Sequence, residues 1–285
     1  MKAVFSLWKR PVDYGLIRYG YNSIFDMACS YVLAIEKARQ FYPEIHLVTD
    51  DSGKNLLVSL LKIPFDTVTT ELNDLVNLSP MHWAMPKIIA MKIQEKPFIY
   101  LEGNIILWKD IPEELKKMDM VFQNPEPSDL FDLYYHSIIK NNFMNVPAKP
   151  KSIDGFEIGT AFNTSLSLIN NLELSGYWAE AAIDYVNNSE NAAFWQEELS
   201  AGRHHNMIFD YWFPACIASR AGLIASNNVG FYLKEYNVGD YRYTHTHGET
   251  RREKNVTEGI WKHIETDYPQ YVDALITLRN RTSIS

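Results

Sequence analysis

Short apolar runs alternate with helix-forming segments through the first 110 residues, and this alternation constrains the fold more than any other feature of the sequence. Strands are predicted at residues 3–7, 45–49, 66–68 and 98–107, with helical patterns between them. Strands that alternate with helices form mostly parallel sheets whose faces the helices cover. We therefore predict an α/β fold with a mixed, mostly parallel central sheet and a more helical C-terminal part.

The second half of the chain is less regular. Strands are predicted at residues 119–123, 162–169, 223–225 and 229–233, and helices at 129–141, 174–185, 192–199, 207–219 and 257–279. No internal repeat interrupts the 285 residues, so we predict a single domain over 1–285.

The balance of charge narrows the range of partners. Lys and Arg total 27 against 35 Asp and Glu, a net charge of −8. This excess of acid argues against a protein that binds nucleic acid over a broad surface. A local basic pocket for one phosphate group remains compatible with it.

Cysteine content and hydropathy indicate the compartment. Cys29 and Cys216 are too few for a disulfide framework and have no zinc-type spacing. No window approaches the roughly 18 apolar residues that a membrane span requires. We expect a soluble, cytoplasmic protein, with peripheral membrane association left open.

The strand predicted at 98–107 is interrupted by Glu102-Gly103-Asn104. Gly103 permits a sharp turn or the close approach of a ligand. Glu102 and Asn104 offer side-chain oxygens at the carboxyl end of a strand, where α/β sheets bind ligands, and Mg²⁺ or Mn²⁺ prefers such oxygens. The alternative is a simple β-turn, for which Gly-Asn is common chemistry.

His245 and His247 offer a second metal hypothesis. On a strand, both imidazoles would lie on one face and could bind zinc, as in a zinc-dependent hydrolase. The arginines at 251 and 252 follow closely and would repel a cation. We keep the hydrolase as the less favoured alternative.

The segment IYLEGNIILWKDI, residues 99–111, resembles the Asp-x-Asp segment of nucleotide-sugar glycosyltransferases with a GT-A fold, most closely family 8 and its bacterial relatives. The resemblance implies that Glu102 and Asn104 stand where the family holds a divalent cation on the sugar-nucleotide diphosphate. Asn104 replaces a carboxylate with a neutral amide. This departure removes one negative charge, so we expect weaker metal affinity or none.

Two later segments extend the resemblance, which covers about residues 1–255. FNTSLSLINN, residues 162–171, is similar to the family's segment near the donor sugar and acceptor. In THTHGETRRE, residues 244–253, His245, Gly248 and Arg251 match the family's His-x-x-Gly-x-x-Lys spacing. The resemblance implies that His245 is the third metal ligand and that Arg251 contacts the diphosphate, to which its guanidinium fork is suited.

Other site residues follow from this placement and from local chemistry. The resemblance implies that residues of the first two strands contact the nucleoside and that a basic residue lies near the diphosphate. Sugars also stack on aromatic rings, which favours tryptophans near a cleft. The donor-binding candidates on this ground are Ser6, Trp8, Asp50, Trp83 and Lys87.

The acceptor-side candidates are Asn163, Asp210 and Asp154. Asp210 lies among aromatic residues, so its carboxylate either has a buried partner or serves a pocket. For Asp154 the alternative is turn chemistry.

The resemblance thus implies a glycosyltransferase that moves a sugar from a nucleotide sugar, with a UDP-sugar as one candidate, to a carbohydrate or other acceptor. Residues 1–125 would form the nucleotide-binding half and residues 126–285 the acceptor side. A divalent cation would serve as cofactor if the altered motif still holds one, and cell-surface polysaccharide synthesis is the implied setting. The alternative is a non-catalytic relative that binds a nucleotide sugar through a decayed motif.

Overall fold

The computed structural model describes residues 1–13, 15, 19–126, 143–153, 160–203, 205–234 and 240–282. The chain forms two compact units. Unit 1 comprises Met1–Pro80, Leu101–Asp110 and Lys234–Ser285, and unit 2 comprises Met81–Tyr100 and Ile111–Leu233. Strands covered by helices occur in both units, which confirms the predicted α/β class. The single domain over 1–285 stays a prediction.

Unit 1 is built on three parallel strands. They are β1 (Lys2–Leu7), β2 (Ile45–Thr49) and β3 (Thr67–Thr69), in the order β3-β2-β1. Ala3 lies opposite Ile45, and His46 lies opposite Thr67. Every residue of β2 is buried, as expected of a parallel strand with both faces covered. The parallel order brings the carboxyl ends of β1 and β2 to one edge.

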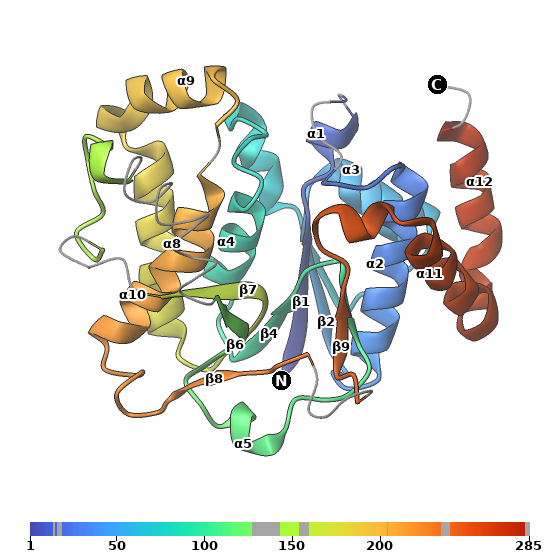
Figure 1. The fold of residues 1–285 in the computed structure, drawn as a ribbon. Coiled ribbons are helices and arrows are strands. Elements are labelled where there is room, and N and C mark those ends of the chain that lie inside the picture. Colours follow the sequence, from blue (N-terminus) through green and yellow to red (C-terminus); the bar gives the residue numbers. More distant parts are fainter. Residues whose placement is uncertain are drawn as a thin grey trace. The chain divides into compact units, whose positions relative to one another are not determined.

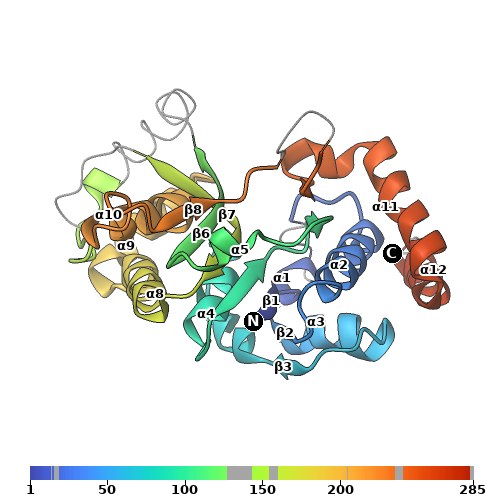
Figure 2. The same cartoon turned by 90° about the horizontal axis from the view of Figure 1, so that it is seen from below.

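Helices cover these strands in Figures 1 and 2. The helices of unit 1 are α1 (Arg10–Asp13), α2 (Ile24–Arg39), α3 (Asp51–Lys54), α11 (Lys254–Asp267) and α12 (Val272–Thr282), with shorter helical turns at Asn55–Leu60, Glu71–Asn77, Gly248–Arg252 and Pro269–Tyr271. Ser23 caps α2, since its Oγ accepts a hydrogen bond from the Asp26 N–H at 3.0 Å. Both α11 and α12 pack against α2.

A separate two-stranded antiparallel ribbon completes unit 1. It pairs β5 (Ile105–Leu107) with β9 (Tyr243–His245). The ribbon therefore joins the segment that follows the Glu102-Gly103-Asn104 interruption to a segment near the C-terminus.

Unit 2 contains the strands β4 (Phe98–Leu101, all but its last residue), β6 (Met120–Glu126), β7 (Ala161–Ile169) and β8 (Val229–Phe231), in the order β4-β7-β6-β8. β6 pairs antiparallel with β7 and parallel with β8. Its helices are α4 (Met85–Lys92), α5 (Glu113–Lys116), α8 (Leu172–Asn187), α9 (Ala192–Ser200) and α10 (Phe213–Arg220), with shorter helical turns at Phe143–Asn145, Ser189–Asn191 and Ile208–Trp212. No helix in the described parts of the chain is long and apolar enough to cross a membrane.

One predicted strand is wrong. Residues 221–227 form consecutive turns where a strand was expected at 223–225. The Leu223 N–H donates to the Ala218 carbonyl at 3.0 Å, and the Ser226 N–H donates to the Gly222 carbonyl at 3.0 Å. These local bonds extend the end of α10 and use the groups that a strand would need. The helix predicted at 129–141 lies outside the described residues.

A charge cluster, in which Glu198 and His205 are buried and Arg203 is exposed, lies at the end of α9. Glu198 accepts from Arg203 Nε at 2.9 Å and lies 2.6 Å from His205 Nε2. The Arg203 hydrogen bond chiefly, and then that of His205, holds the pKa of the Glu198 carboxyl at about 2, below its usual 4.5.

This depressed pKa predicts an acid-sensitive contribution to stability. Because the folded pKa lies below the unfolded one, the contribution is full above pH 4.5 and is lost as the pH falls towards 2. We expect the wild type to be more stable than Glu198→Gln at pH 6, with a difference that shrinks between pH 4.5 and 3. Urea unfolding of both proteins across this range measures it, and a constant difference would contradict the assignment.

Candidate functional site

The β5–β9 ribbon brings together two segments that are far apart in the chain. Ile105 lies directly opposite His245. Just beyond this pair, the Thr246 N–H donates to the Asn104 carbonyl at 3.1 Å, and Asn104 Nδ2 donates to the Thr246 carbonyl at 3.2 Å. Asn104 and Thr246 are separated by 142 positions in the sequence. The backbone of the Glu102–Asn104 turn thus adjoins the His245–Arg251 segment.

Two buried oxygens in this region lack hydrogen-bond partners within the described part of the chain. They are Asn104 Oδ1 and Thr246 Oγ1, on side chains of which only 3% and 2% is exposed. A buried oxygen without a donor costs free energy unless a ligand, ion or water satisfies it. These atoms therefore fit an oxygen-binding cation or a donor group of a ligand.

Gly103 is fixed by contacts from α2. A Cβ at this position would lie 2.4 to 2.6 Å from three ring atoms of Tyr31, so only glycine fits. The Tyr31 ring cannot easily withdraw, because its hydroxyl donates to the Ser6 carbonyl at 2.8 Å. On the other side, Ser30 Oγ donates to the Gly103 carbonyl at 2.7 Å. The sequence suggested that Gly103 permits a sharp turn or the close approach of a ligand, and in the structure the Tyr31 ring makes the close approach.

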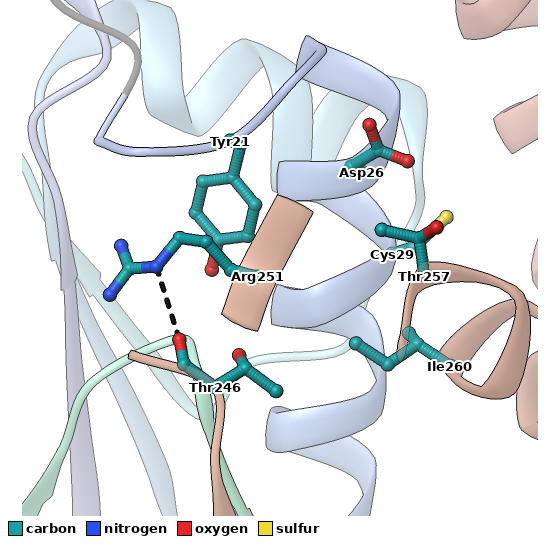
Figure 3. A pocket seen from close by; sticks show the side chains of 7 residues that line it. All are labelled: Tyr21, Asp26, Cys29, Thr246, Arg251, Thr257 and Ile260. Atoms are coloured by element: carbon teal, nitrogen blue, oxygen red, sulfur yellow. Dashed lines mark hydrogen bonds between the residues drawn. The ribbon is translucent and has the colours of Figure 1, made fainter. Parts of the chain in front are cut away.

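Arg251 is held on three sides within unit 1. Its Nε donates to the Thr246 carbonyl at 3.1 Å, as Figure 3 shows, and its Nη1 donates to the Tyr19 carbonyl. The guanidinium carbon lies 5.2 Å from the centre of the Tyr21 ring, which adds a cation–π contact. A small pocket adjoins it and is lined by Tyr21, Asp26, Cys29, Thr246, Arg251, Thr257 and Ile260.

Burial governs the ionisation of the tyrosines beside Arg251. Burial raises the pKa of the Tyr21 hydroxyl, and the nearby Arg251 charge opposes part of that rise while Glu102 adds to it. Burial also raises the pKa of Tyr19, with a further contribution from Asp50. Both hydroxyls therefore stay protonated near neutral pH and act as hydrogen-bond donors.

The donor-binding candidates at the ends of the first two strands are buried. Asp50 accepts from the Gly53 N–H at 2.7 Å and from the Arg10 N–H at 2.6 Å, so it caps α3 and anchors the start of α1. Trp8 is buried, and its Nε1 has no hydrogen-bond partner among the described residues. Ser6 is buried at the end of β1. The structure thus gathers Ser6, Trp8 and Asp50 at the carboxyl edge of β1 and β2.

The histidines of the ribbon lie side by side. The rings of His245 and His247 are 5.1 Å apart, and His247 Nδ1 lies 3.3 Å from the His245 carbonyl. Within the described ranges, no group of three or more His, Cys, Asp or Glu could hold a metal ion. Gly248 has φ +51°, a left-handed conformation that favours glycine, and it begins the helical turn that carries Arg251.

In unit 2, Lys87 and Asp210 form a buried ion pair. Lys87 Nζ lies 3.0 Å from Asp210 Oδ1 and Oδ2, and it donates to Thr164 Oγ1 at 3.0 Å. Thr164 Oγ1 in turn donates to Asp210 Oδ1 at 2.7 Å. Lys87 is 3% exposed and Asp210 is fully buried. Of the two alternatives that the sequence left for Asp210, the structure shows a buried partner, Lys87, and each neutralises the charge of the other.

The remaining candidates in unit 2 are placed less tightly. Asn163 lies on β7, where its Nδ2 donates to Glu126 Oε1 at 3.0 Å. Trp83 is half-buried just before α4. Asp154 lies outside the described residues.

Sequence reasoning missed Tyr21, Ser30, Tyr31 and Thr246. Tyr31 and Ser30 lie on α2, Tyr21 precedes it, and none of the three belongs to a recognisable motif. Only Thr246, which stands between the two histidines, had a positional signal.

Comparison with protein families gives one match over nearly the whole chain. The model of a family of unknown function, DUF6734, matches residues 1–278. The chain belongs to this family. No match was found among curated proteins.

Three solved structures resemble this DUF6734 chain at low sequence identity. Mouse xyloside xylosyltransferase 1 in its apo form covers 81% of this chain and 84% of its own at 13% identity, with a TM-score of 0.39. The alignment with galactosyltransferase LgtC, in complex with donor and acceptor sugar analogues, covers 81% of this chain and 73% of the LgtC chain, with 15% sequence identity and a TM-score of 0.39. The alignment with inositol-1-phosphate CTP transferase from T. maritima covers 93% of this chain and 96% of that chain, with 11% sequence identity and a TM-score of 0.38. Likenesses at this level carry no argument about activity.

The Gly103–Tyr31 contact yields a test of the turn. We expect Gly103→Ala to lower the free energy of unfolding by about 1–3 kcal/mol, because the new methyl group overlaps a pinned ring. Gly259→Ala is the matched control in the same unit. Gly259 lies inside α11 with no atom near its would-be Cβ, so alanine should stabilise by about 0.5–1 kcal/mol. Urea unfolding measures both, and equal effects would refute the contact.

Proposed function

We propose that this protein is a glycosyltransferase that moves a sugar from a nucleotide sugar to a hydroxyl acceptor. The observation that carries the proposal is the β5–β9 pairing. It puts the Glu102–Asn104 turn beside the His245–Arg251 segment, the two segments that the sequence resemblance requires to meet. A UDP-sugar is the donor class to test first.

In this proposal Glu102, Asn104 and His245 hold a divalent cation. The buried, unpartnered Asn104 Oδ1 in the described structure suits a hard cation, which accepts neutral oxygens as well as carboxylates. Because three acidic or imidazole ligands do not gather in the described residues, the diphosphate oxygens would complete the coordination. Such a cation, when bound, would neutralise charge on the diphosphate.

Arg251 has the fixed geometry expected of a diphosphate-binding residue. Its contacts with Thr246, Tyr19 and Tyr21 hold the guanidinium before any ligand arrives. In the transfer, the bond from the anomeric carbon to the diphosphate oxygen breaks and its electron pair stays on the diphosphate. The acceptor oxygen bonds to the anomeric carbon and releases its proton. The pre-positioned Arg251 guanidinium would stabilise the negative charge on the departing diphosphate without reorganisation.

The other predicted residues have different standing in the proposal. Asp50 and Trp8 shape the carboxyl edge of β1 and β2, where the nucleoside would bind. Lys87 and Asp210 are committed to each other inside unit 2, so we assign them no direct contact with substrate. Asn163, Trp83 and Asp154 remain predictions.

One observation favours a second candidate, a non-catalytic nucleotide-sugar-binding protein. The turn carries one carboxylate, Glu102, where the resembled motif carries two. A weaker cation site could support binding without turnover. Both candidates predict binding of a nucleotide sugar, and only the glycosyltransferase predicts release of the nucleoside diphosphate.

Nucleotide binding and turnover decide between them. We expect UDP and UDP-sugars to bind more tightly with Mn²⁺ than without it, and UDP-sugar to release UDP when carbohydrate acceptors are supplied. Glu102→Gln should remove the Mn²⁺-dependent part of the affinity, since it deletes the carboxylate charge. Calorimetry and a UDP-release assay measure these. Binding without release would favour the second candidate, and no binding by the wild type would refute both.

The adjacent arginines provide a matched pair. Arg251→Met should weaken UDP binding by roughly ten- to a hundredfold, the value of a charge-assisted hydrogen bond. Arg252→Met removes an equal charge whose partners are Glu249 and the Gly20 carbonyl, and it should change affinity by less than about threefold. Thermal unfolding of both variants controls for structural loss. Equal weakening by the two variants would remove Arg251 from the site.

A further inference from the structure

The peptide group between Gly103 and Asn104 sets the orientation of the turn that carries both proposed ligands. Its carbonyl is directed at α2, where Ser30 Oγ donates to it at 2.7 Å. A trans peptide is planar, so this bond also directs the Asn104 N–H away from α2. Rotation of this plane would change ψ of Gly103 and φ of Asn104, and with them the backbone conformation of the turn. The Ser30 hydrogen bond therefore bears directly on the backbone at Asn104, in the turn that also carries Glu102.

The Ser30 hydroxyl donates to the turn and not to a carbonyl of its own helix. Ser30 lies in the interior of α2, where a serine hydroxyl commonly bonds to the carbonyl four residues before it. Serine also forms helices less readily than alanine. Ser30 is fully buried, yet its proton goes across to a turn 73 positions away. The residue thus serves the turn more than the helix.

Tyr21 determines the direction of the Ser30 proton. The Tyr21 hydroxyl donates to Ser30 Oγ at 3.1 Å, so Ser30 receives one proton and has its own to give to Gly103. Burial raises the pKa of Tyr21, so its hydroxyl keeps its proton across the neutral range. The same Tyr21 ring lies beneath the guanidinium of Arg251. Tyr21 therefore contacts both Ser30, which bonds to the turn, and Arg251, the proposed diphosphate-binding residue.

We propose that Tyr21 and Ser30 are positioning residues that form a hydrogen-bond relay, Tyr21 to Ser30 to the Gly103 carbonyl, and fix the turn for cation and diphosphate binding. The functional part of this inference rests on the proposed function. The relay itself rests on contacts inside unit 1. It predicts that loss of either hydroxyl loosens the turn and weakens nucleotide binding while the fold persists.

Three variants and one control test the relay. We expect Ser30→Ala to raise the Kd of UDP with Mn²⁺ by roughly five- to tenfold, the value of one buried hydrogen bond. Tyr21→Phe should act in the same direction but less. The double variant should match Ser30→Ala, because the two hydroxyls act in series. Ser175→Ala is the control, since Ser175 is a buried serine on α8 whose Oγ has no partner in the described structure, and it should leave the Kd unchanged.

Amide hydrogen exchange tests the relay apart from nucleotide binding. Ser30→Ala should speed exchange in the peptide covering residues 102–106, while Ser175→Ala should not. If the wild type binds no UDP but this exchange still rises, the relay stands and the proposed function fails. If Ser30→Ala matches Ser175→Ala in exchange, or if the two single variants add fully in Kd, the relay is wrong. Should Ser30→Ala fail to fold, Tyr21→Phe, which removes one oxygen, decides on the same readouts.

Discussion

The antiparallel pairing of β5 with β9 is the constraint on which the candidate site depends. Three bonds at its end, between Asn104, Thr246 and Arg251, hold the late segment against the turn that interrupts the early strand. Without this ribbon, nothing in the sequence would bring Glu102 near Arg251, because they lie far apart in the chain. The ribbon itself is short, so the packing of α2 against Gly103 supplies the second fixed point. The β5–β9 pairing and the packing of α2 therefore both hold the Glu102–Asn104 turn.

In unit 2, two site candidates chosen on local grounds are partners of each other. A lysine on a helix before a strand end and an aspartate among aromatic residues both suggested contact with substrate. The structure pairs them with each other and with Thr164, all three buried. Two isolated charges in such a core would be prohibitively costly, whereas a hydrogen-bonded pair is tolerated. Neither residue alone carried this information in the sequence, because their partnership spans 123 positions.

The strands and helices with strong periodicity could be predicted from the sequence. β1, β2, α2 and α8 lie where their apolar spacing indicated, and Ser23 caps α2. The strand expected at 223–225 failed, because local bonds at the end of α10 outcompeted a weak apolar run. In the site, motif spacing identified the turn and the histidine segment. It could not find Tyr21, Ser30 or Tyr31, since their role arises from a close approach between α2 and Gly103 that no local pattern encodes.

The amide at position 104 has a structural role that a carboxylate could not fill. Asn104 Nδ2 donates to the Thr246 carbonyl, so the side chain helps to hold β9 against the turn. A carboxylate cannot donate, and in the same place it would face a carbonyl oxygen with no proton between them. The amide oxygen meanwhile stays buried and unpartnered within the described chain. Asn104 therefore bonds across to Thr246 through both its backbone carbonyl and its amide nitrogen, and an aspartate at position 104 would lose the second of these bonds.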